Sequence, residues 1–503
     1  YKGWLGGYFG KIIRRLEEGK PVNPFALRQA VFDIKTVLAN KGYPYARVAY
    51  AIDTIASAPV APVEFRVESD SLVYFGDITV EGSEYYPEYV ARRELKIITG
   101  EVYSREAILE SQERLFESGY FSFPQLIQNE DQADRLRPDF LLKVRERKPM
   151  YIDVKTGAGQ SEVRDLIWDF STGFGKRNLF GSRRVDLAAG YSFSVGQDSR
   201  LITHLYRLRY TEPWFLGIRM PIALTGEFEP PIRSVLQEFD ISRWSISAST
   251  SKRFGREIKS TAGLEYVKVE ISGVPAEAAD SLRQSEGISV RRKLYSTFRR
   301  DSRDNIFIPR RGSLTDLSAD YYGGFLGGDN SFFKLEGSWS RYQILWPGWI
   351  SATRIKGGWV DSFGDSDAVP EEERLYLGGA NTVRGFVENS LGPLRDDGSA
   401  SGAKMTVVFN QEFRWKTLQI FRPLPLLGDF FETLPLWQSV FFDMGNGFRT
   451  RSEIKLSNFA YSYGTGFQIV SPAGPIRIDY ARRIATDRFD FDSRWHFTIL
   501  YAF

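Results

Sequence analysis

The last ten residues of the chain, RWHFTILYAF, alternate between apolar and polar side chains. The apolar positions are Trp495, Phe497, Ile499, Tyr501 and Phe503. A period of two predicts a β-strand with one apolar face, because successive side chains of a strand point to opposite sides. Soluble proteins usually blunt or cover an exposed apolar edge. We therefore expect this terminal strand to pair with another strand and to face apolar surroundings.

The same alternation recurs from Pro149 onward, in segments such as RRVDLAAGYSFS, FFKLEGSWSRY and KMTVVFNQEFRW, with turn signals between them. The polar faces of these segments carry Arg, Glu and Lys in mid-strand, which is typical of a wet lumen. At ~10 residues per strand plus turns and loops, residues 149–503 accommodate about sixteen antiparallel strands. The pattern predicts a membrane all-β barrel, and a large soluble β-sandwich is the alternative.

The residues before Pro149 show helix and strand signals in turn. Asn23 and Ser104 are predicted to cap two amphipathic helices, and Pro87 is predicted to open a third, PEYVARRELK. LANKGY and LFESGY end the two capped helices in the same way, which indicates a repeat. We predict two small α+β modules of order β-α-α-β-β, at residues 1–69 and 70–148, of which the first lacks its opening strand and is expected to continue upstream. The alternative is one ordinary α+β domain.

The composition narrows the function further. The chain has 503 residues, 15% aromatic residues and a formal net charge of only +3, which gives no electrostatic argument for nucleic-acid binding. It lacks cysteine and any run near the ~18 apolar residues of a membrane-spanning helix. The two histidines, His204 and His496, have no nucleophile motif beside them. We therefore predict no enzyme, no cofactor and no metal site.

An acidic stretch, DSFGDSDAVPEEE at Asp361–Glu373, is the one sequence feature that suggests a cation site. It lacks the ligand spacing and the glycine of an EF-hand loop. We expect a solvated outer loop instead of a calcium site.

Five motifs in the barrel region carry a family resemblance. The first is VRGF, at Val383, Arg384, Gly385 and Phe386; the others are YTEPWF, RDSRDNIFIPRRG, FFDMGNGF and GPIRIDYA. In their order along the chain, with VRGF third, they resemble the barrel motifs of the BamA and TamA family of outer-membrane insertases, and the two N-terminal repeats resemble the POTRA modules of that family. The resemblance covers nearly the whole chain. It implies a sixteen-stranded barrel in the bacterial outer membrane, with POTRA modules in the periplasm.

The resemblance also implies a site in the long loop at about 362–402, which is expected to fold into the lumen. In the family the loop arginine lies against acidic residues of the inner wall, which gives Arg384 as donor and Glu412 and Asp443 as acceptors. The alternation of their strands independently points both carboxylates inward. Gly385 would permit a tight turn, and Phe386 would anchor the loop.

A barrel of this family would insert client proteins through a lateral gate between its first and last strands. The predicted first strand, MYIDVKTGAGQ, contains Gly157 and Gly159, which weaken strand pairing. We expect it to pair weakly with the terminal strand and to part from it, so that an unfolded outer-membrane protein, a β-barrel or an autotransporter, adds a strand.

The resemblance also implies partners, and the sequence leaves two alternative functions open. The partners would be these clients, the lipid bilayer, and accessory assembly lipoproteins or an inner-membrane-anchored TamB-like protein. The alternative functions are a two-partner secretion transporter and a barrel-based outer-membrane hydrolase. The residues do not distinguish a BamA-like from a TamA-like role.

Overall fold

A computed structural model describes residues 6–14, 16, 22–53, 62–129, 134–160, 166–195, 200–231, 240–274, 286–395, 398–416, 436–471 and 474–499. The chain forms two compact units. The first comprises Tyr1–Tyr151 with Lys176–Arg183, and the second comprises Ile152–Gly175 with Arg184–Phe503.

The first module of the smaller unit contains two helices and a two-stranded antiparallel sheet. Its elements are α1 (Gly6–Ile13), α2 (Pro24–Ala39), β1 (Arg47–Ile52) and β2 (Val63–Glu68). Helix α2 begins where the sequence predicts, because the Asn23 side chain accepts hydrogen bonds from the amides of Phe25 and Ala26. Its apolar stripe, which includes Ile34 and Leu38, is buried in the module core.

The second module follows the order β-α-α-β-β. Its elements are β3 (Ile78–Glu81), α3 (Glu88–Arg92), α4 (Arg105–Glu117), β4 (Gln125–Gln128) and β5 (Phe140–Lys143). The sheet order is β3-β5-β4, with β5 parallel to β3 and antiparallel to β4. As predicted, Ser104 caps α4: its hydroxyl accepts a hydrogen bond from the Ala107 amide.

Two details of this module differ from the sequence prediction. Helix α3 ends at Arg92, not at Lys96, since the Lys96 amide donates to the Ser111 hydroxyl instead of a helical carbonyl. Strand β4 is absent from the sequence prediction, because its four residues carry too short a pattern to mark a strand. Its extended conformation is stabilised by antiparallel pairing with β5.

Leu115 is expected to be a main source of stability in the second module. Its side chain in α4 is fully buried, whereas Leu109 in the same helix is 54% exposed. Leu115→Ala should reduce the free energy of unfolding by about 2–5 kcal/mol, because it leaves a cavity in the core. The matched change Leu109→Ala should cost roughly 0.5 kcal/mol or less. Hydrogen exchange of the amides at 73–147 measures the difference, and equal protection in the two variants would contradict it.

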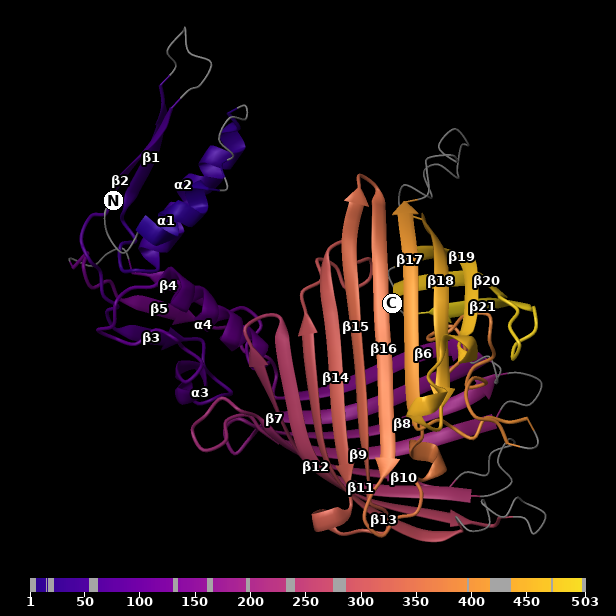
Figure 1. The fold of residues 1–503 in the computed structure, drawn as a ribbon. Helices are drawn as coiled ribbons and strands as arrows, with labels where there is room; N and C mark the ends of the chain where they lie inside the picture. The colour runs from indigo at the N-terminus through magenta and orange to yellow at the C-terminus, as the bar shows by residue number, and fades with distance from the viewer. Residues whose placement is uncertain are drawn as a thin grey trace, which may run out of the picture. The chain divides into compact units, whose positions relative to one another are not determined.

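The larger unit is a sixteen-stranded antiparallel sheet, which confirms the predicted fold class. Figure 1 shows the strands wrapped into a barrel, with β6–β10 running behind β14–β17. The strands are β6 (Met150–Gln160), β7 (Leu166–Leu179), β8 (Arg183–Val195), β9 (Arg200–Glu212), β10 (Ile222–Glu229), β11 (Asp240–Phe254), β12 (Ile258–Ser272), β13 (Gly287–Asp301), β14 (Gly312–Tyr322), β15 (Phe332–Trp346), β16 (Trp349–Ser362), β17 (Met405–Lys416), β18 (Leu436–Phe448), β19 (Ala460–Ser471), β20 (Gly474–Arg483) and β21 (Ser493–Ile499).

The barrel strands place apolar side chains outside and polar side chains inside. In β17, Phe413 is exposed while its neighbours Glu412 and Arg414 are buried. In β21, Trp495 is 68% exposed while His496 is 2% exposed. This alternation is the one that a membrane barrel requires. Among the described residues, no helix has the length and hydropathy to cross a membrane.

Strands β6 and β21 are the two ends of the hydrogen-bonded strand order. Within the described residues no pairing joins them, so their predicted pairing stays a prediction. Gly157 and Gly159 lie in β6 and Ile499 lies in β21. Tyr501 and Phe503 lie outside the described residues.

Candidate functional site

The connection between β16 and β17, residues 363–404, carries the VRGF motif into the interior of the barrel. Isolated bridges join Leu375 to Ala403 and Leu377 to Leu391, so the connection is a folded structure. Within it, Val383, Arg384 and Phe386 are almost completely buried. Val383 and Phe386 pack in a cluster with Leu377, Leu391, Val408 and Ala460.

Arg384 binds two of the inner-wall carboxylates at once. Its Nε and one terminal nitrogen donate to the two oxygens of Asp443, at 2.7 and 2.8 Å. Its other terminal nitrogen lies 3.2 Å from Glu412 and 3.5 Å from Asp479. The Arg384 amide also donates to Asp443, at 3.1 Å, and the guanidinium lies 3.4 Å from the centre of the Phe441 ring. This fork geometry suits arginine and cannot be formed by lysine.

Two further arginines complete a charge network of three guanidiniums and three carboxylates. Arg477 donates to Glu412 and to Asp479, both at 2.7 Å. Arg414 donates to Glu412 at 2.6 Å. All six side chains are at most 6% exposed. Removing one member would therefore leave an opposite charge buried without full compensation, which is costly in a dry interior.

Glycines of the inner barrel wall make room for this network. A Cβ on Gly445, in FFDMGNGF, would lie 2.8 Å from the Val383 side chain and 3.0 Å from the Val407 carbonyl. A Cβ on Gly466 would overlap the Asp479 carboxylate. Side-chain-free positions on the inner wall thus let the loop and the charged side chains approach the backbone closely.

The structure brings together Arg384, Glu412 and Asp443, the three charged residues that the sequence analysis selected. It adds Asp479, Arg477, Arg414 and Phe441, which that analysis did not select. Asp479 and Arg477 belong to GPIRIDYA and lie two positions apart on one strand, so they share a face. That spacing was the available signal.

Gly385 is held on both sides of its backbone. Its amide donates to Nε2 of His496 in β21 at 2.7 Å, and its carbonyl accepts from Nε of Arg483 in β20 at 2.6 Å. Its φ of +91° lies in the left-handed region that favours glycine. The neighbouring Phe386 packs edge-on against Phe489, with ring centroids 5.3 Å apart.

A second set of contacts holds the outer part of the same loop. Glu372 and Glu373, in the short 3-10 helix η2 (Glu371–Glu373), both pair with Arg291 of β13. Glu373 also accepts from the Tyr322 hydroxyl at 3.4 Å and lies 3.9 Å from Lys334 Nζ. The expectation of a wholly solvated acidic loop is therefore wrong at its C-terminal end, because inward-facing cations of β13 and β15 bind it.

Arg291→Met is expected to release this end of the loop. The Arg291 side chain is 8% exposed and supplies one of the three polar contacts of Glu373, so its loss should cost about 1–3 kcal/mol. Protease added to the outer face should then cleave within residues 363–374 faster than in the unmodified protein. Arg300→Met on the same strand removes a solvent-exposed pair and is the control. Equal cleavage rates in the two variants would refute the role of Arg291.

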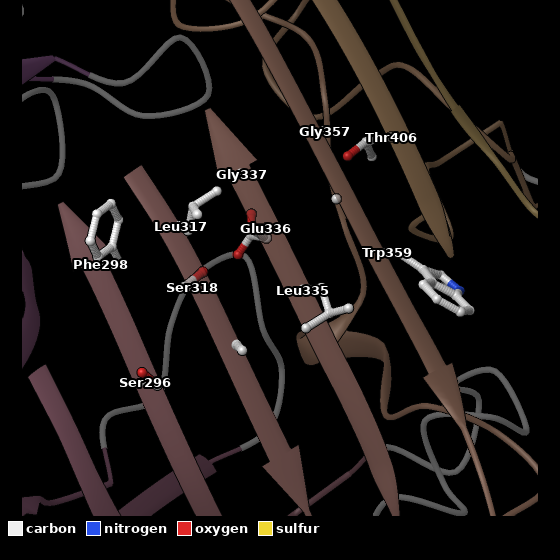
Figure 2. A pocket seen from close by; sticks show the side chains of 12 residues that line it. Ser296, Phe298, Leu317, Ser318, Leu335, Glu336, Gly337, Gly357, Trp359 and Thr406 are labelled. Carbon is white, nitrogen blue, oxygen red and sulfur yellow. The ribbon is translucent and has the colours of Figure 1, made fainter. Parts of the chain in front are cut away.

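Apolar hollows lie on the barrel wall. One of about 580 Å³ spans β13–β17, where Gly337 and Gly357 face each other on adjacent strands between Leu317, Leu335 and Trp359 (Figure 2). A second, of about 680 Å³, spans β6–β11. Polar side chains also line both hollows, among them Glu336 in the first and the Arg207–Glu227 ion pair in the second. In the described part of the chain, no three His, Asp or Glu side chains are grouped so that they could hold a metal ion.

Comparison with known proteins shows which family has this architecture. The family model described as the Omp85 superfamily domain matches residues 178–503, and a POTRA model, described as a surface antigen variable number repeat, matches residues 73–147. The outer membrane protein assembly factor BamA of Nitratidesulfovibrio vulgaris is 26% identical over 484 residues, which are 93% of this chain and 56% of that protein. The sorting and assembly machinery component 50 homolog of Xenopus tropicalis is 25% identical over 71% of this chain and 74% of its own length.

Solved structures share the fold. The crystal structure of BamA from Haemophilus ducreyi lacking POTRA domains 1–3 has a TM-score of 0.67 and 19% identity, and the alignment covers 99% of this chain and 97% of that one. CdiB from Acinetobacter baumannii has a TM-score of 0.52 and 13% identity, with 98% and 86% covered. The chain spans only 56% and 61% of the first two curated relatives. Since the superfamily domain matches more than half of the chain and the predicted family resemblance is confirmed, this chain belongs to the Omp85 superfamily.

Proposed function

We propose that the chain is an assembly factor that inserts client β-barrel or autotransporter proteins into the outer membrane through a lateral gate between β6 and β21. The barrel spans the bacterial outer membrane, and the POTRA modules lie in the periplasm. The observation that carries the proposal is the position of β6 and β21 at the two ends of the strand order, in a chain whose relatives are named assembly factors.

The composition of the two end strands supports a junction that can part. A Cβ on Gly157 would meet no atom within 4 Å, so this position of β6 packs against nothing. Glycine also loses more backbone entropy than other residues when a strand forms. On β21 the side chains that would face lipid, Trp495 and Phe497, are exposed.

The mechanism follows from the cost of unpaired backbone groups in a bilayer. Each such group costs several kcal/mol in hydrocarbon, so a parted β6 edge offers a strong template to an incoming strand. A client strand adds to that edge by β-augmentation and buries its own backbone groups. The driving force is this pairing together with the burial of the client's apolar face in lipid, and no covalent bond is made.

The POTRA modules would collect clients or partners through sheet edges. The order β3-β5-β4 makes β5 the central strand, so it has no free edge, and the candidate edges are β3 and β4. Accessory lipoproteins or an inner-membrane-anchored TamB-like protein would bind on the same periplasmic side.

The rival functions receive less support from the site. A two-partner secretion transporter would pass an extended polypeptide through the lumen, but the loop at 363–404 binds both β13–β15 and β17–β21 there. A hydrolase would need a histidine beside a nucleophile or a pair of acidic groups, and the lumenal carboxylates Glu412, Asp443 and Asp479 are each bound by an arginine. Instead, His204 packs against the rings of Tyr191 and Tyr206, and His496 accepts a hydrogen bond from Gly385.

Reconstitution tests the proposal directly. The protein is placed in liposomes, an unfolded outer-membrane β-barrel is added, and its folding is followed by heat-modifiable migration and protease protection. The proposal predicts faster folding than in empty liposomes. No acceleration, combined with passage of an extended polypeptide into the liposome lumen, would favour the transporter instead.

A further inference from the structure

We infer that His496 couples the lumenal loop to the last barrel strand, so that the seating of the loop controls the position of the gate. This inference rests on the proposed gate between β6 and β21. The observation behind it is the hydrogen bond from the Gly385 amide to His496 Nε2, at 2.7 Å, between a loop and a strand that are 111 residues apart. His496 is 2% exposed, so this contact is shielded from solvent.

The donor and the acceptor of this hydrogen bond are defined. A neutral imidazole offers one acceptor nitrogen, and here Nε2 accepts, so the ring hydrogen resides on Nδ1. Most side chains that could replace histidine in a membrane strand, such as leucine or phenylalanine, offer no acceptor. A buried backbone amide without an acceptor is unfavourable, which ties β21 to the seated loop.

The Gly385 peptide is a shared attachment point for the end of the barrel. Arg483 of β20 binds its carbonyl, while the adjacent Arg384 binds Asp443 of β18 and contacts Asp479 of β20. Asp479 is the cross-strand partner of His496 in the pairing of β20 with β21. The motif therefore holds three of the last four strands from the inside, and His496 is its direct contact with β21.

The expected consequence is a coupling between two motions. While the VRGF segment is seated, β21 keeps its place beside β20. When the segment leaves its site, the Gly385 amide leaves His496, and β21 loses an interior restraint at the edge where the gate opens. His496 thus acts as a positioning residue, because it acts through the loop and not on the client.

The test measures gate geometry and not stability alone. The chain has no cysteine, so Gly157→Cys with Thr498→Cys reports on the β6–β21 junction through its rate of disulfide formation in proteoliposomes. In this background His496→Leu removes the acceptor, whereas His496→Gln retains an amide oxygen for the Gly385 amide. We expect His496→Leu to slow disulfide formation by about fivefold, the factor that one buried hydrogen bond is worth, and His496→Gln to restore the rate.

The outcomes separate this inference from the proposed function. An unchanged or faster rate in His496→Leu, or a His496→Gln variant as slow as His496→Leu, would overturn the coupling even if the disulfide blocks client insertion. Client insertion that persists in the cross-linked protein would instead overturn the gate. Heat-modifiable migration confirms that each variant is folded. If His496→Leu does not fold, His496→Asn, whose amide is too short to reach Gly385, takes its place with the same expected rate.

Discussion

Replacing Arg384 with lysine is expected to release the lumenal loop and to abolish most client insertion. A lysine presents one ammonium group, which cannot satisfy Asp443 through two parallel hydrogen bonds while also reaching Glu412. Lysine keeps the positive charge, but each buried carboxylate oxygen that loses its guanidinium donor costs about 1–3 kcal/mol. We expect protease to cleave near residues 383–386 in the variant, and the rate of client folding in proteoliposomes to fall at least about tenfold.

Two comparisons make this result specific. Asp443→Asn should behave like Arg384→Lys, since it removes the charge that Arg384 binds on two oxygens. Arg451→Lys changes an exposed arginine of another loop and should leave both readouts unchanged. Full insertion activity together with unchanged protease resistance in Arg384→Lys and Asp443→Asn would refute the anchor.

A disulfide across the proposed gate, Gly157→Cys with Thr498→Cys, is expected to stop client insertion until it is reduced. An incoming strand needs a free β6 edge, and a covalent link between β6 and β21 holds that edge closed. Insertion should therefore fall to the level of empty liposomes under oxidising conditions and recover when a reductant is added.

The control disulfide joins two strands that should never part. Thr297 of β13 and Ser318 of β14 are paired residues, so Thr297→Cys with Ser318→Cys locks an ordinary wall position. We expect this variant to insert clients at the unmodified rate in both redox states. Normal insertion with the β6–β21 link intact would show that clients use another route.

The alternation of apolar and polar residues predicts the local features of this molecule better than it predicts the long-range contacts. Alternation indicates barrel strands and turns Glu412 and Asp443 inward, since the side-chain period of a strand is a local property, and the length of the region gives about sixteen strands. The contact of Gly385 with His496 depends on the order of strands around the barrel and on the depth of the loop, which no local pattern encodes. The binding of Glu373 by Arg291 is of the same kind, because it joins residues 82 positions apart.

The buried network explains why a short motif is informative here. Arg384 needs acceptors from β17, β18 and β20 together, and the glycines at 445 and 466 leave space that no larger side chain could leave. Each of the segments VRGF, FFDMGNGF and GPIRIDYA therefore supplies part of one site, although none of them identifies the site by itself.

The most direct test of the account is to trap a client strand at the β6 edge. Single cysteines are placed along β6, from Ile152 to Gly157, and along the terminal strand of an unfolded β-barrel client, and disulfides are scored during insertion. The account predicts cross-links that follow the period of two and one strand register along β6. Cross-links with no such period, or cross-links that form with a cysteine at the lumenal position Ser439 but not with β6, would contradict it.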